Sequence, residues 1–414
     1  MDFNDSPQDA AFRKEVQTWL AANAAEYKRD ASEGAQSSQR AAKARSEEEQ
    51  LQRARTWQKK KAAAGYAAVT WAKEYGGLGG TPIQAVIYGQ EEAKYNVPRG
   101  FFEIGLGMCI PTLISWATKE QLQRYVKPAL YGEDVWCQLF SEPSAGSDLA
   151  GLRTRAERSA DGKSWTINGQ KVWTSGAQFS DYGILVTRSD PNVPKHKGLT
   201  YFFLDMRSPG VEVRPIRQMS GEAGFNEVFF KDVVIPDEQR LGDVGQGWKV
   251  ALTTLMNERL AIGQGEGVDV GDLVELARMV EWEAGPAIQD ASVRERLADW
   301  YVQTQGLKYT KYRTLTALSK GETPGPGSAI GKIVSGPKMQ DIGAFGMELQ
   351  GQGGIVRASG ANAFQSQWVW GAGYRIAGGT DEILRNIVAE QVLGLPQDIR
   401  VDKNVPFNEL PQGK

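Results

Sequence analysis

The spacing of the apolar residues changes twice along this chain, and that change limits the folds open to it. Apolar residues recur at helical spacing to about residue 130, alternate between about 164 and 235, and return to helical spacing from Gly247. The alternating stretch predicts strands at 182–188, 199–205, 211–216 and 226–235. The flanking stretches predict helices at about 81–96, 119–130, 247–264, 270–284, 291–319 and 327–349, and a last one from near Thr380. Helices and strands in separate stretches predict an α+β fold with segregated layers.

One short motif predicts a hairpin. Asn168-Gly169 separates two alternating runs, 164–167 and 170–174. These two residues take the positive φ angles of a type I′ turn at low cost, so we expect two antiparallel strands joined there.

The overall composition argues against several classes of partner. The 414 residues carry 48 Lys and Arg against 50 Asp and Glu, a net charge of −2, which argues against nucleic acid or an anionic membrane held by bulk charge. Apolar stretches fall short of the roughly 20 residues that span a bilayer. The first five residues have neither region of a secretory signal, so we expect a cytoplasmic protein or a processed mature form.

Cysteine and histidine usage narrows the chemistry. Cys109 and Cys137 lack CxxC spacing, and we expect both to be small buried hydrophobes. The single histidine, His196, excludes a multi-histidine metal site and argues against a Ser-His-Asp triad. Its segment, 195–198, predicts a solvated turn. Acid–base chemistry must therefore come from carboxylates or a cofactor.

Two segments in and before the β region are candidates for ligand binding. Segment 139–148 (LFSEPSAGSD) has small residues and hydroxyls whose neighbouring backbone N–H groups suit an anion, or it is only a loop entering the β region. Segment 173–176 places Trp173 beside small hydroxyl residues, which suits one wall of a planar-ligand site, or the tryptophan is part of the core.

Two further candidates lie in helical regions. The neighbours of Glu258 on its helix face are mostly apolar, so its carboxylate would be partly desolvated, its pKa raised and its strength as a base increased. The alternative is an exposed or ion-paired glutamate. Segment 377–382 (AGGTDE) has two glycines before a helix that Thr380 could cap, which suits phosphate or ribose oxygens or is a plain loop-to-helix junction.

In this order, the segments resemble the acyl-CoA dehydrogenase family over essentially the whole chain. Residues 141–148 are similar to its S/T-E-P-x-A-G-S-D signature, and 173–175 to its W-x-T/S flavin segment. Gly247-Trp248, the run 350–354 and the run 378–380 fall where the family places their counterparts. The resemblance implies a helical domain (1–133), a β-barrel-like middle domain (134–243) and a C-terminal four-helix bundle domain (244–414).

The resemblance also implies one FAD per subunit of a homodimer or homotetramer. Trp173 would cover the flavin ring with Ser175 near N5, and the loop 350–354 would contact a FAD bound mainly to a neighbouring subunit. The residues that match cofactor-contacting positions are Phe140, Ser141, Gly146, Ser147, Trp173, Thr174, Ser175, Gln350, Gly354, Thr380 and Glu382. Those on the acyl-CoA side are Ser147, Arg259 and Gly378.

The implied reaction is the α,β-dehydrogenation of an acyl-CoA thioester to the trans-2-enoyl-CoA. A carboxylate takes the α-proton, and the β-hydride passes to flavin N5. Hydrogen bonds to the thioester carbonyl stabilise the developing enolate. By family analogy the electron acceptor is an electron-transfer flavoprotein.

The chain departs from the commonest family pattern at the catalytic base. Most members carry a glutamate immediately before the Gly-Thr of the last motif, where this chain has Gly378. A minority, including isovaleryl- and long-chain-type enzymes, place the base on the helix after the β domain, just before an arginine. Glu258-Arg259 matches that position, so we predict Glu258 as the base, Gly378 as a backbone N–H donor to the thioester, and Arg259 as a supporting partner.

Other features leave alternatives open. The family's R-x-x-F-G motif has only a partial counterpart at Arg278, so we assign no cross-subunit pyrophosphate contact to it. One alternative is a non-catalytic or half-site subunit of a mixed oligomer. The glycine at position 378 is consistent with it, because such a subunit would lack a base. Glu258 argues against it, because an inactive subunit has no need of a carboxylate there. A nitroalkane oxidase or flavin monooxygenase on the same scaffold is a further alternative. The length and branching of the acyl chain cannot be predicted from these residues.

Overall fold

A computed structural model describes residues 5–28, 46–261, 267–320, 325–356 and 363–411. The α-helices in the described part of the N-terminal region are α1 (Pro7–Asn23), α3 (Glu47–Ala63), α4 (Pro82–Glu92), α5 (Ile110–Trp116) and α6 (Lys119–Leu130). Side-chain caps start four of them, at Ser6, Ser46, Thr81 and Thr118. The predicted helix at 81–96 ends early, at Glu92, because Asn96 and the bridge at Tyr95 pair instead with the segment after α1.

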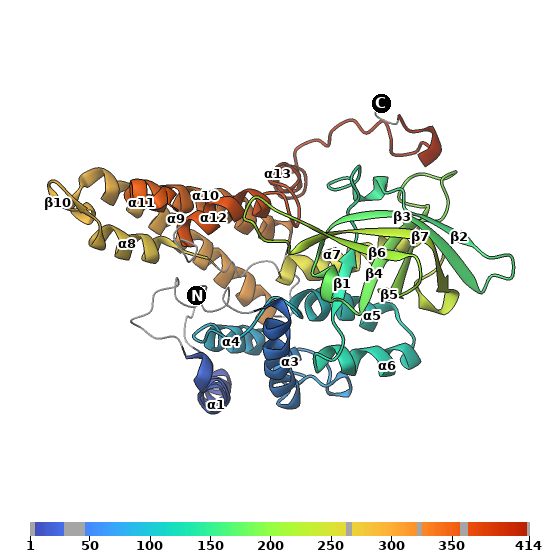
Figure 1. Ribbon diagram of the computed structural model, residues 1–414, viewed down its shortest axis with the longest axis horizontal. Coiled ribbons are helices and arrows are strands. Elements are labelled where there is room, and N and C mark those ends of the chain that lie inside the picture. Colours follow the sequence, from blue (N-terminus) through green and yellow to red (C-terminus); the bar gives the residue numbers. More distant parts are fainter. Residues whose placement is uncertain (1–4, 29–45, 262–266, 321–324, 357–362, 412–414) are drawn as a thin grey trace.

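The middle region is an eight-stranded sheet in the order β6-β7-β3-β2-β4-β5-β8, with β1 paired to β4. Its strands are β1 (Trp136–Leu139), β2 (Arg155–Arg158), β3 (Ser164–Ser175), β4 (Tyr182–Arg188), β5 (Leu199–Asp205), β6 (Val211–Ile216), β7 (Phe225–Pro236) and β8 (Arg240–Leu241). Strands 182–188, 199–205 and 211–216 have the predicted bounds. β1 pairs in parallel with β4 and lies beside it (Figure 1).

The predicted hairpin at Asn168-Gly169 is wrong, because β3 continues through it as one strand. The pairing of β3 with β7 shifts register between Ile167 and Gly169, so the pair forms a bulge and not a turn. A Cβ at position 169 would lie 2.5 Å from Thr154 Oγ1, on a backbone with φ +155. The Asn-Gly pair therefore marks close approach of two strands rather than a chain reversal.

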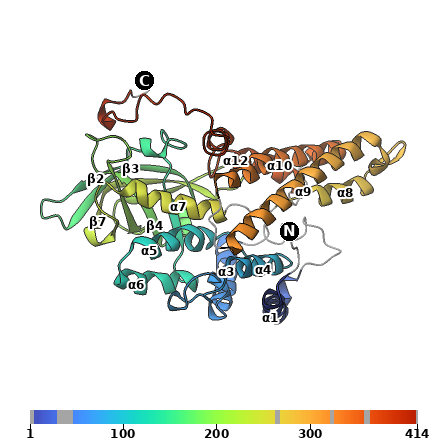
Figure 2. The same cartoon turned by 180° about the vertical axis from the view of Figure 1, so that it is seen from behind.

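Helix α7 (Gly247–Ala261) connects the sheet to the C-terminal bundle (Figure 2). Thr254 on α7 is buried, and its hydroxyl lies 2.9 Å from both Tyr201 Oη on β5 and Thr112 Oγ1 on α5. These contacts fix α7 against both the sheet and the N-terminal helices. The position of the residues near its end, Glu258 among them, is therefore set by two layers.

The C-terminal region is a helical bundle made by α8 (Val270–Met279), α9 (Ala291–Ser319), α10 (Ala329–Leu349) and α12 (Ala363–Tyr374). α11 (Gln352–Ile355) follows α10, and α13 (Asp381–Ile387) follows α12. The predicted helix at 270–284 stops at Met279, because a short hairpin of β9 (Glu281–Trp282) and β10 (Gly285–Pro286) follows. Gly346 allows α10 and α12 to pack closely, since a Cβ there would lie 2.2 Å from the Phe364 ring.

The residues after α13 run back over the middle region (Figure 1). Phe407 N–H donates to Val193 O at 3.0 Å, and the Phe407 ring lies 3.7 Å from the Arg188 guanidinium carbon. Lys195 pairs with Asp402 at 2.5 Å and with Asp148 at 2.8 Å. Through Lys195, the C-terminal segment is thus connected to Asp148, the last residue of the segment 139–148.

The two cysteines and the single histidine all lie away from full solvent exposure. Cys109 and Cys137 are free and buried, as predicted. His196 lies in a turn, but it is half-buried with its ring 4.8 Å from the Trp248 ring, and burial lowers its pKa. The predicted solvated turn is therefore wrong in its exposure. Within the described ranges no helix is long and apolar enough to cross a membrane.

Together these elements give an α+β fold of helical, β and helical-bundle parts. We retain 1–133, 134–243 and 244–414 as our proposal for the domain boundaries.

Candidate functional site

The loop after β1 is a tight turn that exposes small residues. Ser141 O accepts a hydrogen bond from Val172 N at 2.8 Å, and Glu142 and Ala145 exchange two backbone bonds of 3.0 Å each. Gly146 and Ser147 follow and are exposed, and nothing lies within 4 Å of a Cβ built at Gly146. The backbone at 146–147 is therefore open to a ligand. Phe140 differs, because its side chain is in the core against Tyr201.

A buried ion pair holds this loop in place. The Glu142 carboxylate accepts from Arg153 N at 2.6 Å, Thr154 N at 2.9 Å and Lys171 Nζ at 2.8 Å. Lys171, fully buried on β3, also donates to Phe140 O at 2.9 Å. Burial raises the pKa of Glu142, but the Lys171 cation and the N–H donors outweigh it and hold the pKa below its usual range. No motif in the sequence points to Lys171, although a lysine on the inward side of an alternating strand is a usable signal.

Trp173 stands out at the end of β3. Its φ is +61, a left-handed conformation that costs an L residue of order 1–3 kcal/mol, and 57% of its surface is exposed. The β3–β7 register shifts between Lys171 and Thr174, so a bulge turns the indole outward. Its ring lies edge-on to Phe225 at 6.1 Å, and Phe225 lies 5.8 Å from Trp370 of α12. The core alternative for Trp173 is thereby excluded, and an exposed aromatic face remains.

The hydroxyl residues beside the indole add polar groups. The Thr174 side chain is buried, and within the described structure its Oγ1 has no hydrogen-bond partner. Thr174 O is engaged, since it accepts from Asn226 Nδ2 at 3.0 Å. Ser175 is half-buried and is followed by Gly176 at φ +66. An outward indole next to an unpaired buried hydroxyl suits a planar ligand with a polar edge.

Glu258 lies near the carboxyl end of β1. It is half-buried on α7, and Gln138 Nε2 on β1 donates to its Oε2 in a long hydrogen bond of 3.4 Å. Gln138 is three residues before Ser141, so β1 connects the carboxylate to the loop 141–148. Ile262 and the side chains of Arg259 and Ala261, the last a predicted apolar neighbour like Ile262, lie outside the described part of the structure.

The segment 377–382 is bound by a lysine of α10, Lys332. Gly378 and Gly379 have φ values of +63 and +96, and Thr380 caps α13 by accepting from Ile383 N at 3.2 Å. The ammonium of Lys332 donates to Ala377 O and Gly379 O, the two carbonyls that flank Gly378. Lys332 also interacts electrostatically with Glu258. Glu382 is exposed on the first turn of α13.

The structure separates the run 350–354 from these residues. It forms the α10–α11 junction at the end of the bundle far from the sheet (Figure 1). Gln350 Nε2 donates to Gly346 O at 2.8 Å, and Gly354 packs on Met347. That the run contacts a cofactor bound to a neighbouring subunit therefore stays a prediction.

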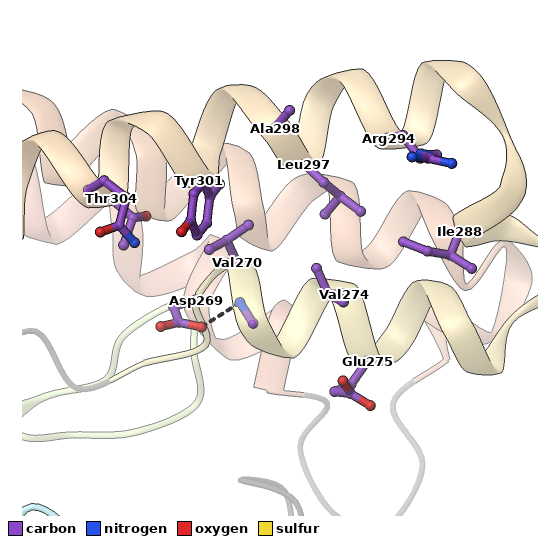
Figure 3. Close-up of a pocket in the computed structure, with 12 residues that line it drawn as sticks. Asp269, Val270, Val274, Glu275, Ile288, Arg294, Leu297, Ala298, Tyr301 and Thr304 are labelled. Carbon is purple, nitrogen blue, oxygen red and sulfur yellow. Dashed lines mark hydrogen bonds between the residues drawn. The ribbon is translucent and has the colours of Figure 1, made fainter.

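A cavity of about 570 Å³ also lies apart from the site (Figure 3). It lies between α8 and α9 and is lined by side chains such as Val274, Leu297 and Tyr301. None of the predicted site residues lines it.

Comparison with known proteins bears on this arrangement. Three family models match the chain in order: acyl-CoA dehydrogenase N-terminal domain at 6–133, middle domain at 137–233 and C-terminal domain at 245–393. The chain is 39% identical over 333 residues to acyl-CoA dehydrogenase FadE34 of Mycobacterium tuberculosis, covering 80% of this chain but only 45% of that protein. It is 35% identical over 367 residues to acyl-CoA dehydrogenase IpdE1 of Mycolicibacterium smegmatis, covering 86% of this chain and 91% of that one.

A solved structure agrees with these relatives. The Tcur3481-Tcur3483 steroid ACAD has 26% sequence identity and a TM-score of 0.77, over 96% of this chain and 100% of that one. The sequence motifs, the three-part fold and the relatives all point to the same family. The chain belongs to the acyl-CoA dehydrogenase family and is a flavin-dependent oxidoreductase.

Proposed function

We propose that this protein catalyses the FAD-dependent α,β-dehydrogenation of an acyl-CoA thioester, with Glu258 as the base that takes the α-proton. The observation that carries the proposal is the hydrogen bond from Gln138 of β1 to the Glu258 carboxylate, three residues before the loop that starts at Ser141. Of the two positions where the family carries its base, only Glu258 holds a carboxylate in this chain.

The residues at the end of β3 fit FAD. The exposed Trp173 indole offers a face for a fused ring, and the unpaired Thr174 hydroxyl and the open backbone at 146–147 offer polar groups. Ser141, Ser175, Thr380, Glu382 and a neighbouring subunit's Gln350 and Gly354 complete the proposed cofactor set. When bound, FAD supplies the acceptor for the β-hydride.

The protein's own groups then have distinct tasks. Glu258 takes the α-proton as the α C–H bond breaks, and Gln138 orients its carboxylate through the 3.4 Å hydrogen bond. The Gly378 N–H, presented by a loop whose carbonyls Lys332 binds, donates to the thioester oxygen and stabilises the charge that develops there. Ser147 and Arg259 remain our proposed contacts to the acyl-CoA.

The test is anaerobic mixing of the purified flavoprotein with a panel of acyl-CoAs, following the absorbance of oxidised flavin. We expect wild type to be bleached and Glu258→Gln to retain FAD without being bleached. Glu295→Gln, at an exposed position of α9, is the matched control and should behave as wild type. A bleached Glu258→Gln would reject the base, and a wild-type flavin that no acyl-CoA reduces would reject the dehydrogenation.

Substrate class and assembly are further proposals. The panel should include bulky steroid-derived acyl-CoAs, since a structural relative at 26% identity is a steroid ACAD. Exposed Trp368, Trp370 and Tyr301 on the bundle support an oligomer, which we propose to be a homodimer or homotetramer. Sedimentation of the protein purified alone tests this against the mixed-oligomer alternative. We propose an electron-transfer flavoprotein as the acceptor, testable by its reduction in a coupled assay.

A further inference from the structure

The last described residues of the chain bind the loop between β4 and β5. They run back over the middle region in both views (Figures 1 and 2). Phe407 N–H donates to Val193 O at 3.0 Å, and Asn408 Nδ2 donates to Asn192 Oδ1, also at 3.0 Å. Several contacts thus tie one short stretch of backbone to the middle region. We call residues 402–408 the C-terminal latch.

Arg188, the last residue of β4, lies against this latch. Only 4% of its surface is exposed. Its guanidinium donates to Ala150 O at 2.5 Å, Leu152 O at 3.2 Å and Lys195 O at 2.8 Å. The Phe407 ring lies over the same guanidinium, with its centroid 3.7 Å from the central carbon. One buried cation therefore contacts both the latch and the backbone that follows the segment 139–148.

Lys195 makes a second connection of the same kind. Its ammonium lies 2.9 and 2.8 Å from the two carboxylate oxygens of Asp148 and 2.5 Å from an oxygen of Asp402. The lysine side chain is only 10% exposed. Asp148 directly precedes the short helical turn 149–151. Each of the two cations thus binds residues within 148–152 on one side and the latch on the other.

These cations hold the far end of a loop whose near end is held by the Glu142–Lys171 pair. Residues 148–152 follow directly on the open backbone at 146–147, so a shift of one displaces the other. The Phe407 ring covers one face of the guanidinium beneath it, and hydrogen bonds sheltered in this way are stronger than those open to water. Without the ring, water competes for the carbonyls and the far end of the loop loosens.

We propose that the C-terminal latch positions the backbone at 146–147 for FAD. Phe407 acts through Arg188, and Asp402 acts through Lys195, so both are positioning residues. The inference rests on the proposed function, because the open backbone at 146–147 is part of the proposed FAD site.

The first measurement is hydrogen–deuterium exchange of the full-length apoprotein, followed in peptides that cover 146–152. Phe407→Leu keeps an apolar side chain and removes the aromatic face over Arg188. We expect exchange in these peptides to become about 3- to 10-fold faster, in line with the loss of a partly desolvated cation–π contact. Phe407→Tyr keeps the ring and should exchange as wild type does. Asp402→Asn should give a smaller increase, because Lys195 still pairs with Asp148.

The second measurement is the dissociation constant of FAD, from a fluorescence titration of the same apoproteins. We expect Phe407→Leu to raise it by about 3- to 10-fold and Phe407→Tyr to leave it unchanged. Ile399→Ala and Asp398→Asn are the matched controls, because both residues are exposed just before the latch. Neither control should change the exchange or the affinity.

Urea unfolding of each variant separates a local effect from a global one. The latch predicts faster exchange at 146–152 with exchange elsewhere in the chain near that of wild type. Asp402→Asn serves in place of Phe407→Leu if the latter does not fold, with Asp402→Glu as the variant that keeps the charge and should restore wild-type behaviour.

Three results would overturn the proposal: unchanged exchange at 146–152 in Phe407→Leu, an unchanged FAD dissociation constant in that variant, or the same changes in Ile399→Ala. Neither measurement uses an acyl-CoA. A wild-type flavin that no acyl-CoA bleaches would therefore reject the dehydrogenation, while the exchange and the FAD titration still decide on the latch.

Discussion

Two buried lysines support the two halves of the site, and they do so differently. Lys171 binds Phe140 O and pairs directly with Glu142 at 2.8 Å, while two backbone N–H groups also bind that carboxylate. Lys332 binds two carbonyls, those of Ala377 and Gly379, on both sides of Gly378. Glu142 is thus fully engaged and serves the fold. Glu258 accepts a hydrogen bond from the neutral Gln138 and is only half-buried.

One type of residue thus serves two purposes in this protein. Where the lysine pairs directly with the carboxylate, the carboxylate is fixed and its charge is compensated. Where the lysine binds carbonyls instead, it holds a stretch of backbone in place. Substitutions at Glu258 should therefore affect the reaction rate, and substitutions at Lys171 and Glu142 should affect stability.

The largest expected effect is on the rate in Glu258→Gln. Loss of a general base lowers the rate by about 10²–10⁴-fold, so the single-turnover rate of flavin bleaching should fall by that factor. The thermal unfolding midpoint should stay near that of wild type, because Glu258 is only half-buried. A Glu258→Gln protein with a large loss of stability and an unchanged rate would contradict the catalytic role of Glu258 and indicate a structural one.

Lys171→Met should act on stability instead. It leaves the Glu142 charge buried without its cation, which costs about 3–5 kcal/mol in free energy of unfolding. Urea unfolding measures the free energy of unfolding. Lys163→Met is the control, because Lys163 is exposed and directly precedes β3. We expect the double variant Lys171→Met, Glu142→Gln to recover part of the loss. A Lys171→Met protein as stable as wild type would show that the pair contributes nothing.

The same pair predicts a pH dependence with a definite sign. The pKa of Glu142 is lower in the folded chain than in the unfolded one, so its contribution to stability is complete above the ordinary glutamate pKa of about 4.3. That contribution is lost as pH falls through the lowered folded value. Urea unfolding from pH 7 downward should therefore show a smaller acid loss in the double variant than in wild type; equal losses would contradict the assignment.

The smallest effect concerns the backbone at Trp173. Because φ is +61 there, Trp173→Gly should be about 1 kcal/mol more stable as apoprotein than Trp173→Ala, a difference that urea unfolding can resolve. Both should bind FAD more weakly than wild type in a titration, because both lose the indole face. Equal stabilities of the two variants would show that the left-handed backbone is not retained in solution.

Much of the fold could be predicted from local patterns. The strand at 199–205 and the helix at 291–319 have their predicted bounds, because apolar spacing reports which face each element buries. Asn168-Gly169 misled because a bulge and a hairpin turn both favour the same residues. Which of the two forms depends on Thr154 and β7, which are distant in sequence.

The site was predictable only in part, for the same physical reason. Trp173 and Glu258 could be proposed from motifs, but the strained φ of Trp173 depends on the β3–β7 register. Lys332 and Ala377 are 45 positions apart, and no local pattern joins them. Long-range pairing of buried charges requires the packed structure.

The left-handed backbone at Gly378 bears on how such an enzyme can change over generations. Restoring a glutamate at this position would place a side chain at φ +63, at a cost of roughly 1–2 kcal/mol, before any catalytic gain. Relocating the base to this loop therefore lowers stability unless the backbone conformation changes as well. A lineage that has adopted the glycine here returns to the other arrangement only through an intermediate that is less stable, so the choice of base tends to persist.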